Sequence, residues 1–331
     1  MAGTSTAGLN SIMLGRLRMS VDQAIDNFKD FSFAVLGQPQ TLLDMANNRH
    51  FSPVKTRNAF QNIIMSSNNF AHQYVSERED TAQNEAFREN GGRRTRTMTV
   101  SYNGSTNREH IWRSYDGLHS KASESRSATI WEVALATSAT PSFFSPMKAN
   151  DATYWDGIVA ENSPSYLALL EITEFHSKSP AVFVNLRSRP AMKAETKRRL
   201  EILARTLSWA HYPPKPLKQR ISDINKLLQY FTTDSTTESE SNQFRELAKS
   251  KGALTAYTLT TEGVLPRPWP IVLRSGSEKV KEALQQTAAT TKHYLQQDEV
   301  RVVINRIAEE AVRIRRARAH ANIEQWEDFV Q

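Results

Sequence analysis

The chain has 331 residues, of which 39% are hydrophobic and 23% charged, proportions typical of a globular protein with one large domain or two small ones. Cysteine is absent, which excludes disulfides, Cys-ligated zinc and thiol catalysis. The formal net charge is +7, and no apolar run approaches the roughly 18 residues that a membrane-spanning helix needs.

Hydrophobic periodicity predicts helices in the first part of the chain. Apolar residues recur at helical spacing over 8–19, and Ser20 with Gln23 forms a capping box for a second helix. A third helix is predicted over 56–67. The polar stretch 77–94 ends in two glycines and is predicted to be a loop.

Strands and helices alternate through the middle of the chain. Helices are predicted over 129–138 and 164–176, and strands over 96–102, over 109–115, at Tyr154-Trp155 and over 181–186. This alternation predicts an α/β fold with a mainly parallel central sheet.

Beyond Arg189 the predicted structure is mainly helical. The segments are helices at about 192–209 and 217–231, a Ser/Thr/Glu-rich loop at 232–243, a strand at 254–259, and helices at about 276–295 and 297–325. We therefore expect a core in residues 1–190 and a helical extension, residues 191–331, that completes the same domain. The apolar stripe of the last helix is expected to face the core, because its polar face mixes both signs of charge.

A turn of small residues stands directly before the first predicted helix, and it reads Gly3-Thr4-Ser5-Thr6-Ala7-Gly8. A serine between small residues at a strand-to-helix turn is typical of a nucleophile elbow, because the turn is strained and the backbone approaches the helix closely. The helix N-terminus beside Ser5 would also favour developing negative charge. A Gly/Ser/Thr-rich terminus without function would look similar, and the fifth motif position is Ala7 instead of glycine.

Several motifs in order carry a more specific likeness. They are GTSTAGLNSIMLGRLRM at the front, WRSYDG from Trp112, WEVALATSATPSFF from Trp131 and YWDGIVAENSP from Tyr154. Together they resemble the patatin-like phospholipase family, especially its fungal members. The resemblance covers about residues 2–190 well and continues weakly to the helix at 290–295. It implies a three-layer α/β/α sandwich.

The resemblance implies a Ser–Asp dyad without metal or cofactor. In the family the elbow serine pairs with an aspartate in an Asp-Gly-Gly or Asp-Gly-Ala turn, which here is Asp156-Gly157-Ile158. Asp156 would accept the hydroxyl proton of Ser5, Ser5 would attack an ester carbonyl, and water would release the acyl-enzyme. The implied substrate is a phospholipid or another acyl ester at a membrane surface.

Part of the family pattern is not found in the sequence. The family has a Gly-rich oxyanion loop after a first strand, upstream of the elbow, whereas here only Met1 and Ala2 precede Gly3. Gly91-Gly92-Arg93 lies in the wrong order to replace that loop. We therefore expect a chain truncated at its N-terminus, without the first strand and the oxyanion loop, and with impaired hydrolase activity.

Three alternatives stay open. A Ser-Asp-His triad would use His176 or His211, which follow Asp156 in α/β-hydrolase order. A catalytically silent remnant would keep the fold as an interaction or lipid-binding module. A nucleic-acid binder would suit the basic charge, but no helix-turn-helix, zinc or RNP-like motif supports it, so we expect no nucleic-acid partner.

The remaining expectations concern location and charge. The first residues contain neither a basic segment nor an apolar one, so we expect no signal peptide and a cytoplasmic location with peripheral contact to membranes. A pI near 9.5 fits an anionic lipid surface or simply a solvated surface. The basic run 313–318 follows Glu309 and Glu310 closely, so pairing along a helix explains it without a ligand.

Overall fold

The computed structural model describes part of the chain, and all structural statements here concern that part. It comprises residues 1–37, 51–67, 70, 73–89, 95–116, 128–140, 143–149, 151–159, 164–176, 181–189, 246, 254–262 and 276–321. The helices predicted at 192–209 and 217–231, the loop predicted at 232–243 and His211 lie outside these residues. The domain boundary at residue 190 stays a prediction.

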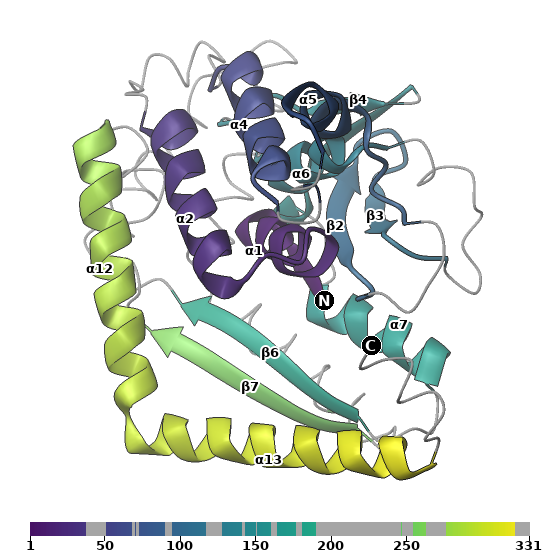
Figure 1. Cartoon of the computed structure of the whole chain (residues 1–331), viewed down its shortest axis with the longest axis vertical. Coiled ribbons are helices and arrows are strands. Elements are labelled where there is room, and N and C mark those ends of the chain that lie inside the picture. Colours follow the sequence, from purple (N-terminus) through teal and green to yellow (C-terminus); the bar gives the residue numbers. More distant parts are fainter. Residues whose placement is uncertain are drawn as a thin grey trace, which may run out of the picture.

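The main sheet has five strands and is mixed (Figure 1). Its strands are β1 (Ala2–Thr4), β2 (Met98–Asn103), β3 (Arg108–Arg113), β4 (Met147–Ala149) and β5 (Ala152–Asp156). β1 pairs with β2 in parallel, whereas the pairs β2–β3, β2–β5 and β4–β5 are antiparallel. The prediction of a mainly parallel sheet is corrected here: the connection 104–107 is too short for a crossover, so β2 and β3 form a hairpin, and β5 also runs antiparallel to both of its neighbours.

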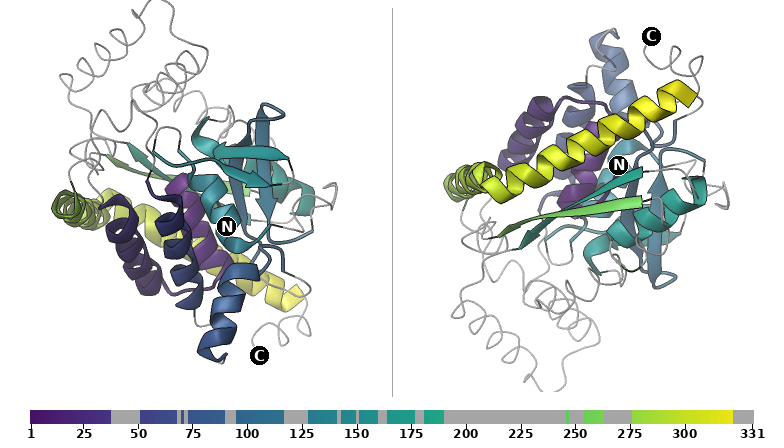
Figure 2. Two further views of the ribbon diagram at one scale, coloured as in Figure 1. Left: turned by 90° about the horizontal axis from the view of Figure 1, so that it is seen from above. Right: turned by 90° about the horizontal axis from the view of Figure 1, so that it is seen from below.

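A second sheet contains two parallel strands, β6 (Ala181–Arg189) and β7 (Leu254–Glu262), both longer than predicted. Helix α13 (Asp298–Ala321) runs alongside them (Figures 1 and 2), and its Glu310 accepts hydrogen bonds from Tyr257 and Thr255 of β7 at 2.6 and 3.1 Å. On the other face, Phe183 packs with α7 (Pro164–His176), and Ser165 donates to Asn185 at 2.8 Å. The two strands therefore lie between α13 and α7.

The other described helices surround the strands. They are α1 (Ser5–Ser11), the π-helical η1 (Ile12–Arg16) and η2 (Ser32–Leu36), the 3₁₀ turn η4 (Gly157–Val159), α2 (Val21–Phe31), α4 (Pro53–Met65), α5 (Val75–Asn84), α6 (Ile130–Ser138) and α12 (Ser277–Gln296). The capping box at Ser20 is present, with the Gln23 amide donating to the Ser20 hydroxyl at 3.2 Å. Every helix predicted within the described residues is confirmed, with bounds shifted by a few residues.

The loop predicted over 77–94 is wrong in its first part, where α5 forms. The helix is polar, but the Glu77 carboxylate accepts a hydrogen bond from the Tyr74 amide at 2.8 Å and caps its start. On the inner side Ala82 is buried, and Trp131 of α6 donates to the Gln83 carbonyl at 3.0 Å. Tertiary contacts therefore stabilise a helix that has almost no apolar stripe of its own.

Two apolar clusters cover opposite faces of the main sheet. The larger cluster includes Leu9 of α1, Phe60 of α4 and Val133 of α6, and α12 adds Val280. The smaller cluster lies under α7 and joins Val100 of β2 to the second sheet. The sheet therefore has helices on both faces, and the predicted α/β class is confirmed.

A buried arginine, Arg16, connects the end of the elbow helix to residues 85–89, which precede β2 in the chain. The Arg16 side chain is 3% exposed at the end of η1. It donates to the carbonyls of Phe87 and Ala86, both at 2.8 Å, and to the carboxylates of Glu85 and Glu89 at 2.7 and 3.3 Å. Arg18 shares Glu89 at 2.8 Å but is 36% exposed. Because Arg16 is buried, loss of its contacts should lower the stability of the fold more than loss of the Arg18 contact.

We predict that Arg16→Ala lowers the free energy of unfolding by about 3–5 kcal/mol, because it leaves buried acceptors without their donor. Arg18→Ala is the matched control and should cost less than about 1 kcal/mol, since the pair is partly exposed to solvent. Urea denaturation followed by circular dichroism measures both changes. Equal losses for the two variants would contradict this account of the buried contacts.

Candidate active site

Ser5 and Asp156 lie near each other because two strands end at the same place on β2. A strand has two hydrogen-bonding edges, and β3 pairs along β2 from Met98 to Asn103 on one of them. β1 and β5 therefore share the other edge. β1 runs parallel to β2 and ends with Thr4 opposite Val100, while β5 runs antiparallel and ends with Asp156 opposite Ser101. The two strand ends thus point toward each other.

The elbow at Ser5 is tight and strained. Ser5 has a φ of 55°, in the left-handed region that non-glycine residues rarely adopt. A Cβ added to Gly3 would lie 2.2 Å from the carbonyl oxygen of Ala7, so the chain folds back too closely for any side chain at Gly3. Ala7 itself is exposed, which explains why its methyl group is tolerated at the fifth motif position.

The backbone of Ser5 is held from α6. The Ser5 amide donates to the Thr137 hydroxyl at 3.2 Å, and that hydroxyl donates to the Val100 carbonyl at 2.8 Å. Thr4 donates to the same carbonyl at 3.0 Å. A Cβ on Gly8 would lie 2.6 Å from the Thr137 hydroxyl oxygen, so α1 and α6 touch at this point. Thr137 lies in the motif WEVALATSATPSFF that starts at Trp131, but the sequence alone does not indicate its contact with Ser5.

The carboxylate of Asp156 is completely buried, with 0% exposure. Its Oδ2 accepts a hydrogen bond from Thr140 Oγ1 at 2.6 Å, and its Oδ1 accepts one from the Ile158 amide at 3.0 Å. Gly157 follows directly, and a Cβ there would lie 2.3 Å from Thr4 Oγ1. The predicted glycine of this turn is therefore required for close contact with the elbow strand.

Burial raises the pKa of Asp156 to about 6. Hydrogen bonds from Thr140, from the Ile158 amide and from the Ser5 hydroxyl act in the opposite direction and lower this pKa. The carboxylate is therefore mostly ionised at neutral pH, yet it is a better proton acceptor than an aspartate in water. The pair thus places a hydroxyl beside a carboxylate that can accept a proton.

Comparison with protein-family models matches the sequence to patatin-like phospholipase over residues 1–169. This chain belongs to the patatin-like phospholipase family. The match extends from β1 into α7 and confirms the family resemblance of the motifs, and it assigns the protein to a family of lipid acyl hydrolases. The fungal type and the truncation stay predictions. No curated protein matches the chain.

Among the side chains that the structure describes, no histidine forms a hydrogen bond with Asp156 of this patatin-like chain. His176 is the last residue of α7, and its side chain lies outside the described part. His110 on β3 is in ring contact with Trp112 and Tyr154, at centroid distances of 4.2 and 5.0 Å. Burial lowers the pKa of His110 to about 4, and its Nε2 has no hydrogen-bond partner among the described residues.

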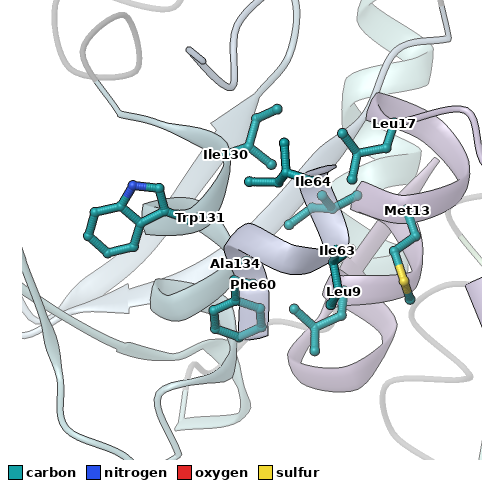
Figure 3. A pocket seen from close by; sticks show the side chains of 10 residues that line it. Leu9, Met13, Leu17, Phe60, Ile63, Ile64, Ile130, Trp131 and Ala134 are labelled. Atoms are coloured by element: carbon teal, nitrogen blue, oxygen red, sulfur yellow. The ribbon is translucent and has the colours of Figure 1, made fainter. Parts of the chain in front are cut away.

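A small apolar cavity of about 10 Å³ lies behind the elbow helix (Figure 3). Side chains of α1, η1, α4 and α6 line it, among them Met13, Phe60 and Trp131. Neither Ser5 nor Asp156 lines it, and its volume is about that of one water molecule. It is therefore a packing gap of the core and not a substrate site.

Metal-ligand clusters and membrane-spanning helices are both absent from the described ranges. No three His, Asp or Glu side chains of these ranges come together as metal ligands. No helix within them combines the length and the apolar character needed to cross a bilayer.

We predict that the buried charge of Asp156 makes stability depend on pH. The pKa of Asp156 is about 6 in the folded protein and 3.8 as the ordinary value, so the folded state binds the proton more tightly. This contribution is complete below pH 4 and is lost as the pH rises through 6. Relative to Asp156→Asn, the free energy of unfolding should therefore fall by about 2 to 3 kcal/mol between pH 4 and pH 7.5.

Urea denaturation at several pH values measures this difference. Asp151→Asn, in the exposed turn before β5, is the matched control for the chemical change. A difference between wild type and Asp156→Asn that stays constant across the range would contradict the raised pKa.

Proposed function

We propose that this patatin-like protein hydrolyses acyl esters of lipids with Ser5 as nucleophile and Asp156 as its base. The observation that carries the proposal is the meeting of a strained serine with a buried, hydrogen-bonded carboxylate. Strained backbone that persists in a folded protein points to a functional constraint, and a buried acid with a raised pKa points the same way.

The reaction follows from these two groups. As Ser5 Oγ attacks the carbonyl carbon, Asp156 accepts the hydroxyl proton, and the carbonyl oxygen gains negative charge. The tetrahedral intermediate collapses when the leaving alcohol takes the proton from Asp156, and the acyl group stays on Ser5. Water then attacks the acyl-enzyme, gives its proton to Asp156, and the acid leaves as Ser5 takes the proton back. The family supplies the lipid substrate class.

The raised pKa of Asp156 matters for the first step. A carboxylate with a pKa near 4 is a poor acceptor for a hydroxyl proton. A shift toward 6 narrows the difference between the pKa of the carboxylate and that of the serine hydroxyl. The same shift keeps the carboxylate ionised above pH 6, so it is available as a base at neutral pH.

A lipid-binding role with little turnover is the second candidate. The Ser5 amide donates to Thr137, so the amide of Thr6, next after the nucleophile, is the backbone donor that would meet the oxyanion. Each oxyanion donor typically contributes about 10² to 10³ in rate, so a site with a single backbone donor is expected to be slow. We therefore propose that residues 1–331 hydrolyse their substrate slowly.

We also propose that the protein is cytoplasmic, contacts membranes peripherally and binds no nucleic acid.

We predict that hydrolysis of activated short-chain esters by residues 1–331, measured with chelator present, disappears in Ser5→Ala and in Asp156→Asn. His176→Ala and His211→Ala are the controls and should keep most of the rate. The rate should rise with pH through about 6, because Asp156 must be ionised to accept the proton. A histidine change as damaging as Ser5→Ala, in a protein with an unchanged circular dichroism spectrum, would replace the dyad with a triad.

A further inference from the structure

Thr140 lies just beyond the end of α6, and hydrogen bonds fix its backbone on both sides. Its amide donates to the Ser138 carbonyl at 2.8 Å. Its carbonyl accepts from the amides of Phe143 and Phe144 at 3.1 and 3.0 Å. The turn therefore holds the backbone of Thr140 in place independently of the contact between its side chain and Asp156.

The hydroxyl of Thr140 has one proton and two acceptors within range. The Oδ2 atom of Asp156 lies at 2.6 Å and the carbonyl oxygen of Ser138 at 3.4 Å. The shorter bond goes to a buried carboxylate, and a bond to an ionised acceptor is the stronger kind. The proton therefore points to Asp156. Because the Ile158 amide holds Oδ1 at 3.0 Å, both carboxylate oxygens are held and the group cannot rotate freely.

We propose that Thr140 is a positioning residue of the dyad, whose hydroxyl keeps the Asp156 carboxylate ionised and oriented toward Ser5. The inference rests on the proposed function, in which Asp156 is the base of Ser5. Thr137, three residues earlier, bonds to the Ser5 backbone amide. The C-terminal end of α6 thus contacts both members of the pair, one through each threonine.

The groups that determine the pKa of Asp156 lie in direct contact with it. Of the hydrogen bonds that lower the pKa of Asp156 against the effect of burial, the one from Thr140 is the largest. α1 and β2 contain no charged residue. The other ionisable groups on elements packed around the site, as far as their side chains are described, are the Met1 amine, Tyr102 of β2, Arg108, Glu109, His110 and Arg113 of β3, Glu132 of α6, Lys148 of β4, Tyr154 of β5, and Tyr166 and Glu171 of α7. The pKa of Asp156 is set by burial and the three hydrogen bonds, with no contribution from these groups.

The test compares three variants. Thr140→Val removes the hydroxyl at nearly constant volume, and Thr140→Ser keeps it. Thr137→Val removes the same group from the same end of α6, but from the Ser5 backbone instead of the carboxylate. The free energy of unfolding is measured between pH 4 and pH 8 for each variant, alone and combined with Asp156→Asn. The pH dependence that Asp156→Asn removes gives the pKa of Asp156 by linkage, whether or not the protein turns over substrate.

Thr140→Val should raise the pKa of Asp156 by roughly one unit, which is the size expected for losing a hydrogen bond to a charged group. Thr140→Ser and Thr137→Val should leave it close to wild type. In the esterase assay, the midpoint of the pH profile should move upward for Thr140→Val alone. If Thr140→Val does not fold, Thr140→Ala removes the same hydroxyl and is interpreted in the same way.

Three results would overturn the inference: an unchanged pKa in Thr140→Val, an equal shift in Thr140→Ser, or an equal shift in Thr137→Val. Absence of esterase activity in every protein is a separate outcome. Combined with a shifted pKa in Thr140→Val, it would overturn the proposed function and leave the contact between Thr140 and the carboxylate supported.

Discussion

The edge of β2 that β1 and β5 share determines where both candidate catalytic residues lie. The two strands approach along β2 from opposite directions, so their last residues, Thr4 and Asp156, stop at neighbouring positions on it. The Val100 carbonyl lies at this junction and accepts hydrogen bonds from Thr4 and Thr137. Space there is so limited that Gly157 cannot carry a side chain. The sheet pairing therefore does the positioning that flexible loops do in many other sites.

The fold maintains two unfavourable features at this junction. A serine in the left-handed region costs about 1–3 kcal/mol, and an ionised aspartate without solvent costs about as much again. The apolar clusters on both faces of the sheet hold the surrounding elements in place. Such costs are expected where a site is built for reactivity, and here both fall on the two residues that the family motifs single out.

Much of the fold and the two main site residues could be predicted from local patterns. The capping box of Ser20 and Gln23 marks the start of α2, and short ordered motifs identify Ser5 and Asp156 as candidate site residues. These features depend on neighbours in the sequence, so they are visible without a structure.

Other features could not be predicted, because they depend on contacts between distant segments. The antiparallel pairs around β2 depend on how the strands pair in space, which the alternation of predicted strands and helices does not reveal. Helix α5 depends on a cap at Tyr74 and on packing against α6, neither of which appears as an apolar stripe. The contact of Thr140 with Asp156 joins residues sixteen positions apart, and only the folded turn after α6 reveals it.

The most direct test of the central claim is to find which serine reacts. Residues 1–331 are incubated with a fluorophosphonate, which forms a stable adduct with an activated serine, and the labelled peptides are mapped by mass spectrometry. The account predicts an adduct on Ser5 that is lost in Asp156→Asn and in protein unfolded before labelling. An adduct on another serine, or one on Ser5 that forms equally well in Asp156→Asn, would contradict it.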